Sequence, residues 1–128
     1  RWPRHAARER PERCWHRVRG APLHARLRHF DPVRGRAGLP ADVAVLVTAM
    51  DATSVSATLV NCHPSQAREI VVQGGAYGEH RIGSVKVEGR SVPAGGRAVR
   101  LRLAPGSGAA VRFATARYAL APTLSFPA

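Results

Sequence analysis

One segment of the sequence gathers three side chains that could carry out acid–base chemistry. Tyr77, Glu79 and His80 follow the glycine pair at 74–75, so a phenol, a carboxylate and an imidazole lie close together along the chain. Such groups transfer protons when they face one cleft. Adjacent residues of a strand point to opposite faces, however, so Glu79 and His80 are not expected to converge. We therefore predict no catalytic residue here. Tyr77 is expected to cover the core, Glu79 and His80 to anchor a turn, and all three at most to contact a partner or a sugar.

A second group of residues has the chemistry of zinc ligands. One residue separates Cys14 from His16, and Cys62 is adjacent to His63. Neither spacing is usual for a structural zinc site. We therefore predict no bound metal and no cofactor. The two cysteines do not form a disulfide framework, so we expect free thiols, with a single Cys14–Cys62 bridge as the alternative.

The beginning of the chain is strongly basic. Residues 1–36 hold eleven arginines against three acidic residues, within a chain of formal net charge +12. Trp2 and Trp15 lie among these arginines, a mixture that could place guanidinium groups on phosphates and aromatic rings on bases. A nucleic-acid-binding arm is therefore the alternative function. Residues 1–20 contain almost no aliphatic side chain, so they are expected to be disordered. Translation of a GC-rich gene in a wrong frame would give the same composition without any selected structure.

The rest of the chain carries the two-residue periodicity of β-strands. Apolar residues alternate with polar ones in short runs, and Gly, Pro and Asn separate the runs. No helical segment intervenes, so the strands should pair antiparallel. The segment 43–50 also fits a helical template, but its β-branched content favours a strand. The expected strands are 43–50, 54–61, 69–73, 82–88, 98–103 and 109–117.

These elements predict an all-β fold. At 128 residues the chain has room for one core. We expect a small antiparallel β-sandwich of immunoglobulin-like size over residues 37–128, preceded by the disordered basic segment 1–36. Residues 23–27 alternate like a short strand, and we expect 21–42 to be a linker that partly packs on the domain. No apolar run is long enough to cross a membrane, and no phosphate-binding loop or nucleophile elbow occurs.

Several short motifs together resemble a known type of domain. The chain is similar to the C-terminal β-sandwich that follows a helical toroid in large bacterial proteins of glycosidase-like or uncharacterised type, over about residues 21–128. The motifs that carry this resemblance are 59–61, Pro64, 68–72, 73–80, 103–108, 117–118 and 122–123.

The resemblance implies a function without chemistry of its own. In such proteins the reaction takes place in the helical domain and the sandwich packs beside it. We therefore expect a non-catalytic accessory module, the C-terminal fragment of a larger protein, whose partner is a helical catalytic domain. A surface left by that neighbour should be apolar and lie on one sheet face. The resemblance also suggests contact with carbohydrate, and a small independent enzyme is the least favoured reading.

Overall fold

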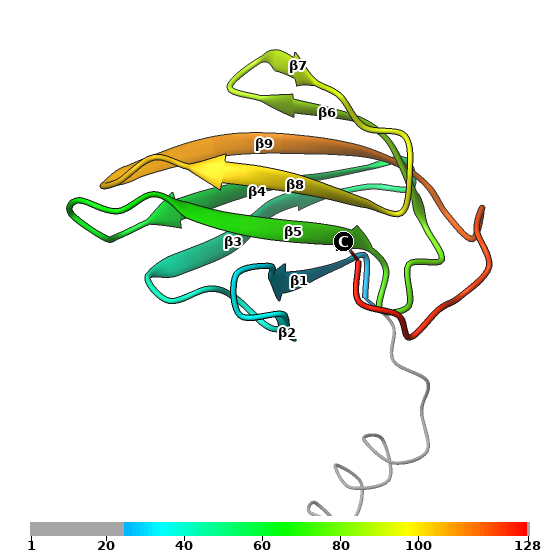
Figure 1. The fold of residues 1–128 in the computed structure, drawn as a ribbon. Helices are drawn as coiled ribbons and strands as arrows, with labels where there is room; N and C mark the ends of the chain where they lie inside the picture. Colours follow the sequence, from blue (N-terminus) through cyan, green and yellow to red (C-terminus); the bar gives the residue numbers. More distant parts are fainter. Residues whose placement is uncertain (1–24, 128) are drawn as a thin grey trace, which may run out of the picture.

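The computed structural model describes residues 25–127, and this part of the chain consists of strands and loops (Figure 1). The predicted all-β sandwich is confirmed. No helix in these residues has the length and apolar character needed to cross a membrane. The predicted disorder of the N-terminal segment concerns mainly residues that lie outside the described part. The strands are β1 (Leu27–Asp31), β2 (Arg36–Ala37), β3 (Val43–Met50), β4 (Ser54–Asn61), β5 (Arg68–Gly74), β6 (Arg81–Val87), β7 (Arg90–Val92), β8 (Ala98–Leu103) and β9 (Ser107–Ala116).

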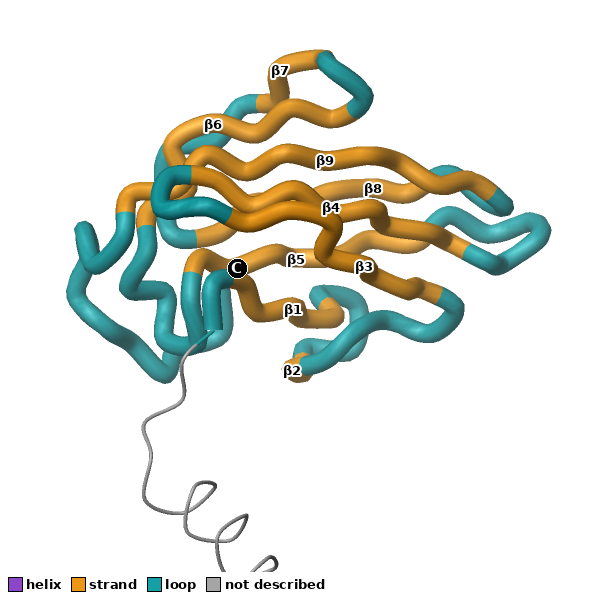
Figure 2. Tube along the Cα trace, turned by 180° about the vertical axis from the view of Figure 1, so that it is seen from behind, coloured by secondary structure: helices purple, strands orange, loops and turns teal. Residues whose placement is uncertain are grey.

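The strands form two antiparallel sheets that pack face to face (Figures 1 and 2). Sheet A has the order β2-β1-β5-β8, and sheet B has the order β3-β4-β9-β6-β7. The hairpin β1–β2 stays within sheet A, and the hairpins β3–β4 and β6–β7 stay within sheet B. The chain changes sheet between β2 and β3, β4 and β5, β5 and β6, β7 and β8, and β8 and β9. These crossings tie the two layers together at both ends of the sandwich.

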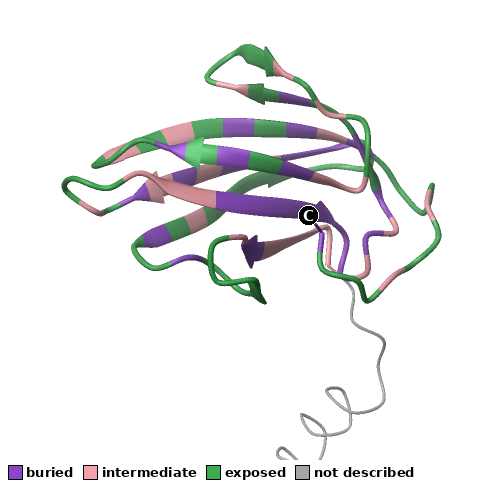
Figure 3. Ribbon diagram, in the orientation of Figure 1, coloured by how far each residue is buried: buried purple, intermediate pink, exposed green. Residues whose placement is uncertain are grey.

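Alternation along the strands places the core between the sheets, as the banding in Figure 3 shows. In β8 the aliphatic residues are buried while Arg100 and Arg102 are exposed, and β9 repeats this pattern around exposed Arg112. Period-two burial of this kind is the signature of strands with one dry face. The core cluster consists of Val43, Leu59, Ile70, Val72, Ile82, Val85, Val99, Leu101, Leu103, Val111 and Phe113.

The folded part begins earlier than the boundary predicted at residue 37. β1 pairs with β5 on one side and with β2 on the other, so residues 27–31 belong to sheet A rather than to a linker. Phe30 lies opposite Val71 in this register. The guanidinium of Arg28 covers the Phe30 ring at 5.1 Å from its centroid. The basic residues of β1 pack along the sheet. Because β1 carries these charges, the sequence pattern assigned it to the basic N-terminal segment.

The C-terminal tail after β9 folds back across one end of the sandwich and reaches sheet A (Figure 1). The backbone of Thr123 donates to the carbonyl of Tyr77, with N···O 2.7 Å. Farther along, the ring of Phe126 meets that of Phe30 edge to face, with centroids 5.3 Å apart. The tail thus covers part of the outer face of sheet A.

Candidate functional site

The loop 75–80, which carries the three residues singled out in the sequence, connects β5 of sheet A to β6 of sheet B. Its shape depends on the glycine pair before it. A β-carbon on Gly74 would overlap the carbonyl oxygen of His80, and one on Gly75 would overlap the carboxylate of Glu79. Gly75 also has φ +85°, a left-handed conformation that favours glycine. The two glycines therefore allow the loop to fold back on the end of β5.

Polar side chains of β5 and β1 hold this loop in place through hydrogen bonds. Gln73, 1% exposed, donates from Nε2 to the carbonyls of Gly75 and Ala76 at 3.1 and 3.2 Å. Arg28 donates to the Ala76 carbonyl as well, at 3.0 Å. Because buried carbonyls need donors, these contacts offset the cost of placing an irregular segment against the core.

The side chains of the loop mainly organise the backbone around them. Glu79 accepts a hydrogen bond from the backbone N–H of Tyr77, at 3.0 Å. His80 is only 3% exposed, and its Nδ1 accepts from the backbone N–H of Tyr118, at 3.0 Å. Tyr77 is partly exposed, and its carbonyl receives the Thr123 N–H of the tail. Glu79 and His80 thus make turn-anchoring hydrogen bonds of the kind expected from the sequence.

The expectation that Glu79 and His80 point to opposite faces was wrong. That expectation assumed strand geometry, whereas residues 75–80 form a turn. Both residues line one small pocket, of about 100 Å³, together with Ala25, Arg26, Arg117 and Tyr118. We call it the His80 pocket. It joins residues from the start of the described chain, from the β5–β6 loop and from the segment after β9.

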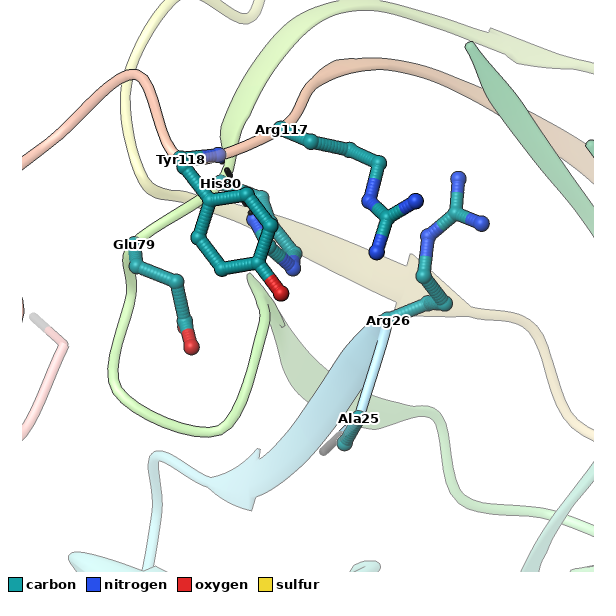
Figure 4. Close-up of a pocket in the computed structure, with 6 residues that line it drawn as sticks. All are labelled: Ala25, Arg26, Glu79, His80, Arg117 and Tyr118. Carbon is teal, nitrogen blue, oxygen red and sulfur yellow. Dashed lines mark hydrogen bonds between the residues drawn. The ribbon is translucent and has the colours of Figure 1, made fainter. Parts of the chain in front are cut away.

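The close-up in Figure 4 shows how these side chains are arranged. In this view the guanidinium groups of Arg26 and Arg117 are drawn next to each other, and the imidazole of His80 is drawn beside the phenol oxygen of Tyr118. Glu79 lines the pocket with them. The Tyr118 and His80 rings meet edge to face, with centroids 4.8 Å apart.

Burial and charge act together on His80. Desolvation lowers the pKa of the imidazole; Glu79 opposes this effect, and the charges of Arg117 and Arg26 add to it. A neutral imidazole that accepts at Nδ1 carries its proton on Nε2. His80 is therefore held as a neutral side chain with a single N–H donor, rather than as a proton carrier.

Tyr118 adopts an unusual backbone conformation to reach this position. Its φ is +54°, in the left-handed region that aromatic residues rarely occupy. Such a conformation costs on the order of 1–3 kcal/mol and persists where surrounding contacts enforce it. Here the Tyr118 N–H to His80 Nδ1 hydrogen bond and the ring contact with His80 enforce it.

The residues considered as zinc ligands do not form a metal site within residues 25–127, where no group of three or more His, Cys, Asp or Glu side chains is suitably placed. Cys62 is exposed and directly follows the end of β4. His63 is partly buried, and its Nδ1 accepts from the backbone N–H groups of Ser65 and Gln66 at 3.1 and 2.9 Å. Trp2, Cys14, Trp15 and His16 lie outside the described residues, and with them the question of a Cys14–Cys62 bridge.

A separate surface lies on edge strand β3. Val47 pairs with Ala57 and Met50 with Val55, and directly paired residues share a sheet face. Ala57 and Val55 are buried in the core, so Val47 and Met50 lie on the core-facing side of sheet B. They are nevertheless 45% and 57% exposed. We call Val45, Val47 and Met50 the β3 surface.

The cause of this exposure is the unequal width of the two sheets. Sheet B ends in β3, which has eight residues, whereas sheet A ends in β2, which has two. The shorter edge of sheet A does not reach over the far end of β3, so part of the core face has no cover among the described residues.

Sequence analysis missed Arg26, Arg117 and Tyr118 as pocket residues and Gln73 as a buried anchor. In the sequence, Arg26 and Arg117 are two of many arginines that make the chain basic. Only the fold brings the segments that carry them together. Comparison of the chain with protein-family models, with curated proteins and with solved structures gave no match.

Proposed function

We propose that the chain is a non-catalytic accessory β-sandwich that packs against a neighbouring helical domain, and that the β3 surface makes this contact. One observation carries the proposal: Val47 and Met50 belong to the core face of sheet B yet are about half exposed. Full burial of such a side chain contributes about 1.5–3 kcal/mol, and these two retain roughly half of that gain for a partner.

The composition of β3 supports an apolar partner. The strand VAVLVTAM contains no charged residue, whereas edge strands are commonly protected by charge or proline. An uncharged edge with exposed aliphatic side chains is typical of a surface that another protein surface covers.

A bulge in β3 favours a helical partner over an added strand. The register with β4 shifts between Val47 and Ala49, which interrupts the regular series of backbone groups along the strand. Bulges twist an edge and hinder strand addition. A helix that packs on the side chains of Val47 and Met50 needs no continuous ladder.

The partner that the sequence resemblance implies is the helical domain of a larger bacterial, glycosidase-like protein. In this proposal that domain performs the chemistry and the sandwich supports it.

The test uses two substitutions on one strand. Val47→Lys places a charge on the core-facing side of β3, and Leu46→Lys places it on the opposite side, where Leu46 is 67% exposed. Each variant is co-expressed with the helical domain that this proposal expects to be encoded beside the sequence. Val47→Lys should abolish co-purification and Leu46→Lys should preserve it.

Two results would contradict the proposal. Equal effects of the two lysines would show that the contact is not made by the core-facing side of β3. Self-association of the isolated chain, lost in Val47→Lys and kept in Leu46→Lys, would identify a second copy as the occupant instead. Sedimentation velocity of the wild type and both variants distinguishes these cases.

A further inference from the structure

We propose that the His80 pocket binds a small oxyanion, a carboxylate or a phosphate group. The pocket is independent of the β3 surface, since none of its lining residues belongs to β3. The pocket is lined by two guanidinium groups, one imidazole, one phenol and one carboxylate. With a neutral imidazole, the lining carries two positive charges and one negative charge.

Two guanidinium groups line the His80 pocket, and like charges placed close together repel each other. Arg117 forms no ion pair with any acidic residue in the described part of the chain, and neither does Arg26. An anion between them would convert this repulsion into two charge-assisted contacts.

The pocket also holds hydrogen-bond donors that no described residue uses. Nε of Arg26 is buried and has no hydrogen-bond partner among the described residues, although another nitrogen of the same group binds the Asp51 carbonyl. His80 holds its single proton on Nε2, because its Nδ1 is occupied by the Tyr118 N–H. Buried donors without partners are uncommon in folded proteins, so Arg26 Nε points to an acceptor at this place, and His80 Nε2 supplies a second donor at the pocket.

The fold holds the side chains of the pocket in place before any ligand binds. Tyr118 is held in a left-handed conformation, and its ring packs against His80. Glu79 lines the same pocket, and its Oε1 accepts a hydrogen bond from the Tyr77 N–H. Preorganised donors bind a ligand without the cost of ordering them.

The size of the pocket limits the ligand. About 100 Å³ corresponds to roughly three water molecules, which suits one carboxylate or phosphate group rather than an entire sugar. The ligand is therefore a small anion or the anionic end of a larger molecule, such as the carboxylate of an acidic sugar or a phosphate ester.

The experiment titrates the full chain with four probes: inorganic phosphate, acetate, glucuronate and neutral glucose. Binding is followed by isothermal titration and by NMR shifts of the backbone amides of Glu79, His80 and Tyr118. Saturable binding is expected for at least one anion and not for glucose. Tighter binding of phosphate than of both carboxylates identifies a phosphate group, and tighter binding of glucuronate than of acetate identifies an acidic sugar.

The variants separate a pocket from the general basicity of the chain. Arg117→Gln should weaken binding about tenfold or more, because a charge-assisted hydrogen bond is lost. Arg90→Gln, which removes an exposed charge on β7 outside the pocket, should change it less than about twofold. Arg117 is exposed and forms no hydrogen bond with the described residues; its contact with the Tyr118 ring, 5.4 Å from the guanidinium carbon to the centroid, lies at an exposed site, so its variant should lower the melting temperature only slightly.

The proposal fails if no probe binds saturably up to about 20 mM, well above the affinity range that a two-arginine site should reach. It also fails if Arg117→Gln and Arg90→Gln weaken binding equally, since that would show attraction by net charge alone. Amide shifts spread over all basic residues, rather than centred on Glu79, His80 and Tyr118, would lead to the same conclusion.

Discussion

The His80 pocket and the β3 surface differ in almost every physical property. The pocket is polar, carries opposing charges and is held by hydrogen bonds from three segments of the chain. The β3 surface is apolar, uncharged and belongs to one strand at the edge of its sheet. The difference shows how one small sandwich can separate recognition of a small anion from contact with another protein domain.

The two regions also depend on different parts of the fold. The pocket requires the crossing between the sheets, because Arg26, His80 and Arg117 come from distant positions in the sequence. The β3 surface requires only that sheet A be narrower than sheet B at one edge. Substitutions in the loop 75–80 should therefore alter the His80 pocket and leave the β3 surface unchanged.

The largest expected effect contrasts a covered and an uncovered position of the core face. Leu59 on β4 is buried, so Leu59→Ala should lower the free energy of unfolding by about 2–5 kcal/mol. Met50 is on the same face but exposed, so Met50→Ala should change it by less than about 1 kcal/mol. Urea unfolding measures both. A loss above about 2 kcal/mol for Met50→Ala would mean that β3 is covered within the chain itself.

The next effect tests the glycine that shapes the pocket loop. Gly75→Ala combines a positive φ with overlap of the Glu79 carboxylate, and should cost about 2–4 kcal/mol. Gly89 has a similar φ of +79° with open space around it, so Gly89→Ala should cost only about 1 kcal/mol. Chemical denaturation of both variants checks this. Equal losses would show that steric contact with Glu79 does not constrain the loop.

A smaller effect should follow from pH. Burial lowers the pKa of His80 and of His29 below the ordinary 6.5, so both remain neutral in the folded state while the unfolded chain takes up protons. Stability is therefore complete above about pH 6.5 and falls as the pH drops below it. The free energy of unfolding measured between about pH 7.5 and pH 5 should decrease. His80→Gln and His29→Gln should each reduce the slope. An unchanged slope in the double variant would contradict this assignment.

Much of the fold follows from two-residue periodicity. Strands such as β4 and β8 alternate clearly in the sequence, and each has a dry and a wet face in the structure. β1 was harder to recognise because Arg28 and His29 interrupt its apolar pattern. Pairing with β5 stabilises this strand, and that pairing cannot be read from the residues of β1 alone. The local sequence indicates which side of a strand is apolar. It does not indicate which other strand a charged strand such as β1 will pair with.

The candidate sites were less predictable for a related reason. The sequence singled out Glu79 and His80 as candidate residues. That both line one pocket could not be predicted, because it depends on residues 75–80 forming a turn rather than a strand. The positive φ of Tyr118 left no sign in the sequence. Exposure of Val47 and Met50 depends on the length of β2 in the opposite sheet, a property that the alternation of β3 itself does not contain.

The most direct test of the proposed function is hydrogen exchange of the backbone amides in the free chain and in its complex with the helical domain. We predict that exchange slows along β3, around Val47 and Met50, and stays unchanged in the loop 75–80. Slower exchange in the loop 75–80 with no change along β3 would contradict the account, because the partner would then occupy the pocket end of the sandwich instead.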